Sequence, residues 1–240
     1  MRGVDPGDGL SPAGVLVQYR QARRTCRTGA LPRTGRGARV IRLGGWSRLS
    51  TCDWPGKLVT TVFTQGCPWR CGYCHNPELL SPRTLPVVDW NSVRLHLFRR
   101  RGLLDGVVFS GGEPLLQTGL VEALREVRAM GYATGLHTAG SYPRRFEQLL
   151  SADLLDWVGF DVKAPPARYD DITATPGSIR PAARSLRALL DSGVPHQLRT
   201  TIDPDQLGPR DLADLDHWLR DLGAEPTVRQ PIRRLSTSGR

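Results

Sequence analysis

Short apolar and β-branched runs alternate with segments of helical spacing along most of this chain. The runs at 59–65, 106–110, 133–137, 157–162, 196–202 and 227–232 predict six strands. Apolar residues recur at three- and four-residue intervals within 120–127, 179–189 and 212–222, which predicts three helices. The alternation indicates βαβ units on a parallel sheet. Periodicity alone leaves open whether that sheet is doubly wound or a partial barrel.

Polar and glycine-rich residues follow each of the first five predicted strands. Ligands of parallel α/β folds gather at the carboxyl ends of the strands, so we expect the chemistry at this edge. The segments concerned are 66–76, 110–114, 137–140, 161–163 and 199–201.

The composition and hydrophobic periodicity of the chain divide it into three parts. Residues 1–38 are rich in Gly, Pro and Arg without sustained periodicity, which predicts a flexible extension. Residues 39–232 form the predicted domain, and 233–240 a basic C-terminal tail. The N-terminus has no apolar stretch typical of a secretory signal, and no run reaches the ~20 residues of a membrane helix. We therefore expect a cytoplasmic protein without a membrane partner.

The net charge of +10, from 33 basic and 23 acidic residues in 240, lies at the two ends of the chain. Residues 1–39 carry a net +6 and residues 226–240 a net +4, so 40–225 is formally neutral. This distribution argues against nucleic acid as the substrate. Only Lys57 and Lys163 among the basic residues are lysines.

Three of the five cysteines, Cys67, Cys71 and Cys74, fall within eight residues. An odd number of cysteines without an export signal favours metal ligation or catalysis over disulfides. A structural zinc site would need a fourth ligand, either His75 or a distant residue. A C-x-x-C-H pattern also fits haem attachment, which normally follows export. A [4Fe–4S] cluster on three cysteines, with one iron open to a small molecule, is the interpretation we favour.

The spacing C-x3-C-x2-C with an aromatic residue before the last cysteine is the signature of radical S-adenosylmethionine (SAM) enzymes, and this chain resembles them. Within that superfamily it is most similar to glycyl-radical-enzyme activases, particularly anaerobic ribonucleoside-triphosphate reductase activating proteins, over roughly 41–232. The resemblance implies a partial (βα)6 barrel with parallel strands and outer helices. It is densest in Gly44-Gly45-Trp46-Ser47, Ser50, Asp53-Trp54-Pro55-Gly56-Lys57, Thr64-Gln65-Gly66-Cys67 and Tyr73-Cys74-His75-Asn76-Pro77-Glu78-Leu79.

The same resemblance implies how the polar strand ends serve two cofactors. One [4Fe–4S] cluster is held by the three cysteines, and SAM chelates its open iron through amino and carboxylate groups. The loop of Gly111 and Gly112, with Glu113, receives the amino group, and the missing Cβ atoms let backbone approach the ligand. Lys163 pairs with the carboxylate. The other implied SAM contacts are Tyr73 and His75 on the adenine side, Thr138 and Asp161 at the ribose, and Gln230 on the last strand.

The implied activity is reductive cleavage of SAM to a 5′-deoxyadenosyl radical, which creates a glycyl radical on a partner enzyme. The favoured partner is anaerobic ribonucleotide reductase, with an electron donor of the flavodoxin or ferredoxin type. No catalytic residue is expected beyond the cluster and SAM site. The nearest alternative is a radical SAM enzyme acting on another peptide or a small molecule. A zinc or nucleic-acid-binding module is the alternative from another class.

The chain departs from the pattern of similar proteins in two respects. Thr138-Ala139-Gly140 stands where they usually have Thr-Asn-Gly, so one side-chain hydrogen bond is missing. Some activases also carry an inserted ferredoxin-like domain with extra cysteine clusters. Cys26 and Cys52 cannot supply one, and we expect a single cluster.

Overall fold

Seven strands of the described chain form one sheet in strict sequence order, β1 to β7. The computed structural model describes residues 41–232, so the predicted N-terminal extension and the basic tail lie outside the described residues. The elements are β1 (Leu43–Ser50), β2 (Val59–Thr64), η1 (Pro77–Leu79), α2 (Trp90–Arg99), β3 (Gly106–Gly111), η2 (Pro114–Leu116), α3 (Leu120–Ala129), β4 (Ala133–Thr138), α4 (Pro143–Ser151), β5 (Trp157–Asp161), η3 (Pro166–Arg168), α5 (Tyr169–Thr173), α6 (Ile179–Ser192), β6 (His196–Ile202), α7 (Pro209–Asp221) and β7 (Val228–Pro231).

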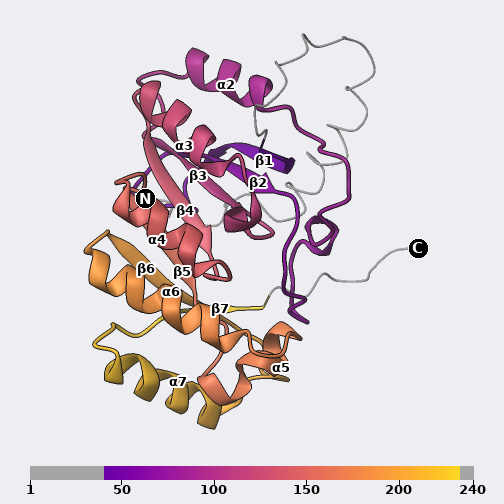
Figure 1. The fold of residues 1–240 in the computed structure, drawn as a ribbon, viewed down its shortest axis with the longest axis vertical. Coiled ribbons are helices and arrows are strands. Elements are labelled where there is room, and N and C mark those ends of the chain that lie inside the picture. The colour runs from indigo at the N-terminus through magenta and orange to yellow at the C-terminus, as the bar shows by residue number, and fades with distance from the viewer. Residues whose placement is uncertain (1–40, 233–240) are drawn as a thin grey trace, which may run out of the picture.

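The strand order decides between the two architectures that periodicity left open. Strands β2 to β7 pair in parallel, and only β1 is antiparallel to its neighbour. A doubly wound sheet reverses its order at one point and carries helices on both faces. Here no reversal occurs, and right-handed crossovers then place every connecting helix on one side. Figure 1 shows α3, α4, α6 and α7 along one side of the sheet, as a partial (βα)6 barrel requires.

The six predicted strands are confirmed, with each end within one residue of its expected place. The three predicted helices correspond to α3, α6 and α7. Strand β1 was missed because it contains two glycines and pairs irregularly with β2. Helices α2 and α4 were missed because their buried faces are short, as the pair Phe146 and Leu149 in α4 illustrates.

Two hydrophobic clusters fill the described domain. The larger lies between the sheet and its helices. The smaller consists of Trp54, Val59, Val108 and Trp157, near the amino-terminal ends of the strands. The rings of Trp54 and Trp157 stack 5.4 Å apart. A Cβ on Gly135 would lie 2.9 Å from the Trp54 ring, so this glycine makes room for it. The segment 53–57 therefore covers the inner face of the sheet at the amino-terminal ends of its strands.

No helix within residues 41–232 is both long enough and apolar enough to cross a bilayer.

Candidate cofactor site

The cysteine loop, residues 66–76, leaves the carboxyl end of β2 and returns beside it at η1. Gly66 begins the loop with φ +99°, and its N–H donates to the Leu79 carbonyl at 2.7 Å. The N–H of Cys74 donates to the carbonyl of Cys71 at 3.0 Å, which closes a tight turn between these two cysteines. The loop is thus fixed at its base, and its tip carries the last two thiols.

The three loop thiols, on Cys67, Cys71 and Cys74, are half-buried and free. Burial, together with the smaller effect of the nearby Glu113 carboxyl, raises the pKa of Cys67 to about 12. Burial also raises the pKa of Cys71, while the positive charge of Lys163 opposes that rise. Within 41–232 no three His, Cys, Asp or Glu side chains already stand in a metal-holding arrangement.

Gly111 and Gly112 bring the end of β3 against the base of the cysteine loop. A Cβ on Gly111, where φ is +113°, would overlap the backbone nitrogen of Thr64 and lie 2.7 Å from the Phe63 carbonyl carbon. A Cβ on Gly112 would lie 2.8 Å from the carbonyl carbon of Gly66. The sequence motif predicts that these glycines allow a ligand to approach the backbone closely. The structure adds a different reason: they are required by contact between two segments of the protein's own backbone.

Glu113 is almost fully buried and is held by three donors on two elements. Its Oε1 accepts from Thr138 Oγ1 at 2.7 Å and from Leu115 N at 3.1 Å, and its Oε2 accepts from Ala139 N at 3.1 Å. Burial raises its pKa, and these hydrogen bonds oppose that rise. Each carboxylate oxygen can accept about two hydrogen bonds. One acceptor position on Oε2 therefore remains for a donor such as a ligand amino group.

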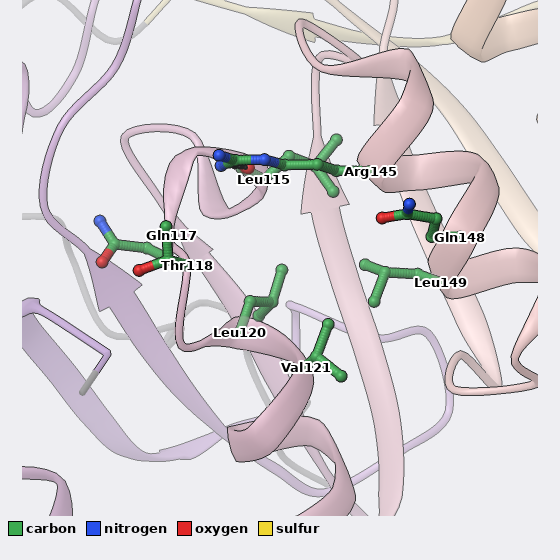
Figure 2. A pocket seen from close by; sticks show the side chains of 8 residues that line it. All are labelled: Leu115, Gln117, Thr118, Leu120, Val121, Arg145, Gln148 and Leu149. Carbon is green, nitrogen blue, oxygen red and sulfur yellow. Dashed lines mark hydrogen bonds between the residues drawn. The ribbon is translucent and has the colours of Figure 1, made fainter. Parts of the chain in front are cut away.

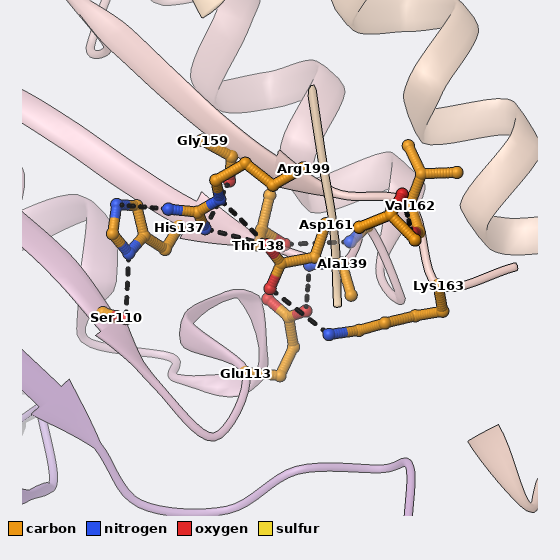
Figure 3. A network of polar contacts seen from close by, with 12 residues as sticks. Ser110, Glu113, His137, Thr138, Ala139, Gly159, Asp161, Val162, Lys163 and Arg199 are labelled. Atoms are coloured by element: carbon orange, nitrogen blue, oxygen red, sulfur yellow. Dashed lines mark hydrogen bonds and ion pairs between the residues drawn. The ribbon is translucent and has the colours of Figure 1, made fainter. Parts of the chain in front are cut away.

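Asp161, at the end of β5, is paired with two cations. Arg199 donates to Oδ1 through Nε at 3.0 Å and Nη2 at 2.8 Å, and Lys163 Nζ lies 3.3 Å from Oδ2 (Figure 3). Although burial favours the neutral acid, Arg199 and Lys163 together hold the pKa of Asp161 well below its usual range. Asp161 in turn holds the pKa of Lys163 well above the usual value. Both groups are charged near neutral pH.

His137, on β4, lies behind this ion pair (Figure 3). Its Nε2 is 2.7 Å from the Asp53 carbonyl oxygen and 3.1 Å from Arg199 Nη1, and its Nδ1 is 3.2 Å from Ser110 Oγ. Burial and the guanidinium lower its pKa to about 4, so the ring is neutral. We assign the proton to Nε2, because the short contact to a carbonyl requires a donor.

The remaining predicted SAM residues lie in different environments. Tyr73 is buried, Lys163 Nζ lies 5.8 Å from its ring centroid, and its hydroxyl has no hydrogen-bond partner. His75 is exposed at the tip of the cysteine loop, and Gln230 is exposed on β7. The fold thus brings most of the predicted residues together at the carboxyl ends of the strands, whereas His75 and Gln230 are exposed there. The residues brought together are Cys67, Cys71, Cys74, Tyr73, Gly111, Gly112, Glu113, Thr138, Asp161 and Lys163.

Two residues of this edge were not predicted as site residues, Arg199 and His137. Both lie in the polar strand-end segments of the sequence, where no role was predicted for them. The strand register could have pointed to them, because Arg199 is the partner of Asp161 across β5 and β6, and His137 is the partner of Gly159 across β4 and β5.

The residues present fit an iron–sulfur cluster and SAM by their chemistry. Three thiols on one short loop match a cluster with one open iron. Lys163 offsets the negative charge of such a cluster, as its effect on the pKa of Cys71 indicates. The buried, unpaired hydroxyl of Tyr73 gives a ligand one further polar atom to meet.

A separate cavity of about 120 Å³ lies between η2, α3 and α4, and no cysteine is among its lining residues (Figure 2). Arg145 crosses its edge and donates to the carbonyls of Leu115 and Leu116 at 2.8 and 2.7 Å. Arg145 therefore holds η2, the turn that follows Glu113, from the side of α4.

Residues 61–216 match the pattern of the Radical SAM superfamily. The chain belongs to the radical SAM superfamily. This membership supports the cluster over the zinc, haem and nucleic-acid interpretations of the sequence. It also agrees with the fold, the thiol loop and the polar edge described above.

Relatives of this radical SAM chain carry activating-enzyme names. It is 30% identical over 197 residues to the pyruvate formate-lyase-activating enzyme of Listeria monocytogenes, covering 76% of each chain. It is 29% identical over 181 residues to a Methanocaldococcus jannaschii protein provisionally named a glycyl-radical enzyme activating enzyme, covering 72% of this chain and 73% of that one.

A solved structure of Streptococcus suis SuiB bound to S-adenosylmethionine has the same fold at 10% identity, with a TM-score of 0.57 over 72% of this chain. This chain spans 40% of that structure's length.

Proposed function

We propose that this chain is a glycyl-radical-enzyme activating enzyme that carries one [4Fe–4S] cluster and binds SAM. The observation that carries the proposal is the meeting of the cysteine loop, Glu113 and Lys163 at one edge of the sheet. The names of the relatives support the same class over three quarters of their length. When bound, the cluster and SAM supply reductive cleavage of SAM to methionine and a 5′-deoxyadenosyl radical.

The chain's own residues prepare the site for that chemistry. Cys67, Cys71 and Cys74 hold the cluster once their thiols lose their protons. Glu113 accepts the amino group of SAM through the free position on Oε2. Lys163, charged and mostly buried, pairs with the SAM carboxylate. Because Glu113 and Lys163 are mostly buried, their charges are weakly screened by solvent and act strongly on the ligand.

The target we propose is a glycine of a glycyl-radical enzyme, with anaerobic ribonucleotide reductase as the favoured partner. A flavodoxin- or ferredoxin-type protein would supply the electron. Pyruvate formate-lyase appears in the names of relatives and is the competing partner. Action on another peptide or a small molecule is the remaining alternative within the superfamily.

The test uses anaerobically reconstituted full chain, which should bind about four irons. Dithionite with SAM should then release 5′-deoxyadenosine. Addition of each candidate partner, followed by electron paramagnetic resonance, should give a glycyl-radical signal on one of them. The matched variants are Cys71→Ala, which should lose the cluster, and Cys52→Ala, an exposed cysteine outside the loop, which should keep it. SAM cleavage that persists in Cys71→Ala would contradict the cluster assignment. Normal SAM cleavage without a radical on either partner would contradict the proposed targets.

A further inference from the structure

Arg199 is a mostly buried cation that the proposed function leaves without a role. Its side chain is 11% exposed, on the central part of β6. Removing a guanidinium from water is costly unless it is paired and hydrogen-bonded. The geometry around Arg199 shows what the charge is used for.

Arg199 contacts only one oxygen of Asp161 and leaves the other to Lys163. Nε and Nη2 both donate to Oδ1, at 3.0 and 2.8 Å, and Lys163 Nζ lies 3.3 Å from Oδ2. Each oxygen of the carboxylate therefore faces its own cation. Asp161 joins the two cations in a fixed order, from Arg199 inside to Lys163 at the edge of the sheet (Figure 3).

The guanidinium is also fixed from behind. Its Nη1 packs 3.1 Å from Nε2 of His137 without a hydrogen bond, because both nitrogens carry protons, and Nε2 itself donates to the Asp53 carbonyl at 2.7 Å. A Cβ on Gly159 would come within 2.9 Å of Arg199 Cζ and 2.8 Å of His137 Cδ2. The missing side chain of Gly159 thus leaves the space that the His137 ring and the Arg199 guanidinium occupy. Arg199 has little freedom to move away from Asp161.

We propose that Arg199 is a positioning residue that orients Asp161 so that Lys163 is fixed where it receives the carboxylate of SAM. Asp161 then acts on Lys163, not on the ribose as the sequence resemblance implied. This inference rests on the proposed function, because it takes SAM as the ligand of the site. Without Arg199, Oδ1 and Oδ2 can both turn toward Lys163 and draw its ammonium group away from the ligand.

The test compares two ligands that differ only in the group that Lys163 would contact. SAM and decarboxylated SAM share the sulfonium, ribose and adenine. Anaerobically reconstituted full-chain protein, kept without reductant so that SAM stays intact, is titrated with each ligand by calorimetry. The variants are Arg199→Gln and the matched control Arg184→Gln, whose arginine makes a two-pronged pair with Glu147 at 2.7 Å on the exposed helices.

We expect Arg199→Gln to raise the Kd for SAM about tenfold and to change that for decarboxylated SAM less than about twofold. Arg184→Gln should change neither. Lys163→Gln should show the same selectivity, and adding Arg199→Gln to it should cause little further loss, because both act on one contact.

Equal weakening of both ligands by Arg199→Gln would overturn the inference, since Arg199 would then support the whole site. No change for either ligand would overturn it as well. Should Arg199→Gln not fold, Arg199→Lys keeps the charge with a single-point donor, and the same selectivity for SAM decides. If the unaltered protein bound neither ligand, the proposed function itself would fail. Failure of the inference alone leaves that binding intact.

Discussion

Replacement of Gly111 by alanine should destabilise the protein even when no cofactor is bound. Gly111 has φ +113°, and a Cβ there would overlap Thr64 N and lie 2.7 Å from the Phe63 carbonyl carbon. These atoms belong to the neighbouring strand, so they cannot yield as the end of a flexible side chain could. The substitution must therefore either shift β2 away from β3 or change the backbone at residue 111.

The size of this effect follows from comparison with Gly102. That residue also has a positive φ, +76°, but a Cβ there would meet nothing within 4 Å. Gly102→Ala should lower the unfolding free energy by about 1–2 kcal/mol, because alanine is strained at a positive φ. Gly111→Ala adds the cost of forcing atoms into a packed region, about 1–3 kcal/mol. We expect a total loss of about 2–5 kcal/mol for Gly111→Ala from these two costs.

The assay is equilibrium urea unfolding of the cofactor-free protein, followed by circular dichroism and tryptophan fluorescence. Both variants should unfold in one transition, with Gly111→Ala at clearly lower urea. Equal stability of the two variants would refute the reasoning. If Gly111→Ala were then defective only in SAM binding, the glycine would serve the ligand, as the sequence argument held, and not the protein backbone.

Three further predictions concern the core, the buried histidine and the thiols. Trp54→Ala should lower the unfolding free energy by about 3–5 kcal/mol, because it removes one of the two tryptophan side chains of the smaller cluster. Leu85→Ala, at an 80%-exposed site, should lower it hardly at all, and equal losses for the two variants in urea unfolding would contradict the packing argument. His137 has its pKa lowered from 6.5 to about 4, so the unfolded chain binds its proton first, and stability is full above pH ~6.5 and falls as the pH drops toward 4. Unfolding free energy should decrease by about 2 kcal/mol between pH ~7.5 and ~5, and a slope unchanged in His137→Gln would exclude this histidine as its source. In metal-free protein Cys67, whose pKa burial raises to about 12, should be alkylated by iodoacetamide much more slowly than the exposed Cys52, as peptide mass spectrometry can measure, and equal rates would show that the thiol is not buried.

The strand positions were predictable from sequence because each parallel strand is a short apolar run bounded by turn residues. His196–Ile202 was predicted to the residue. Strand β1 was not, since a strand at the edge of the sheet that contains Gly44 and Gly45 has little apolar signal. The buried face of α2 was present as Trp90, Val93 and Leu97, at helical spacing, but three positions in ten residues are a weak pattern.

The roles of the site residues were less predictable than their positions. The motif around Gly111 indicated a ligand loop, while its tight contact with Thr64 depends on where β2 ends in space. Likewise Trp54 stood in a recognisable segment, but its stack on Trp157 joins residues about a hundred positions apart. A motif records that a residue type is needed; only the packing tells whether a ligand or the protein itself needs it.

Asp161 shows where more could have been drawn from the sequence. Once β5 and β6 were predicted as parallel neighbours, their ends could be aligned, and alignment places Arg199 beside Asp161. A buried aspartate beside an arginine on the next strand is expected to pair with it, because an unpaired charge at either position would be costly. That pairing in turn commits one oxygen of Asp161 and leaves the other for Lys163, two residues away. The strand register therefore argues for a positioning role for Asp161, which the motif alone assigned to the ribose.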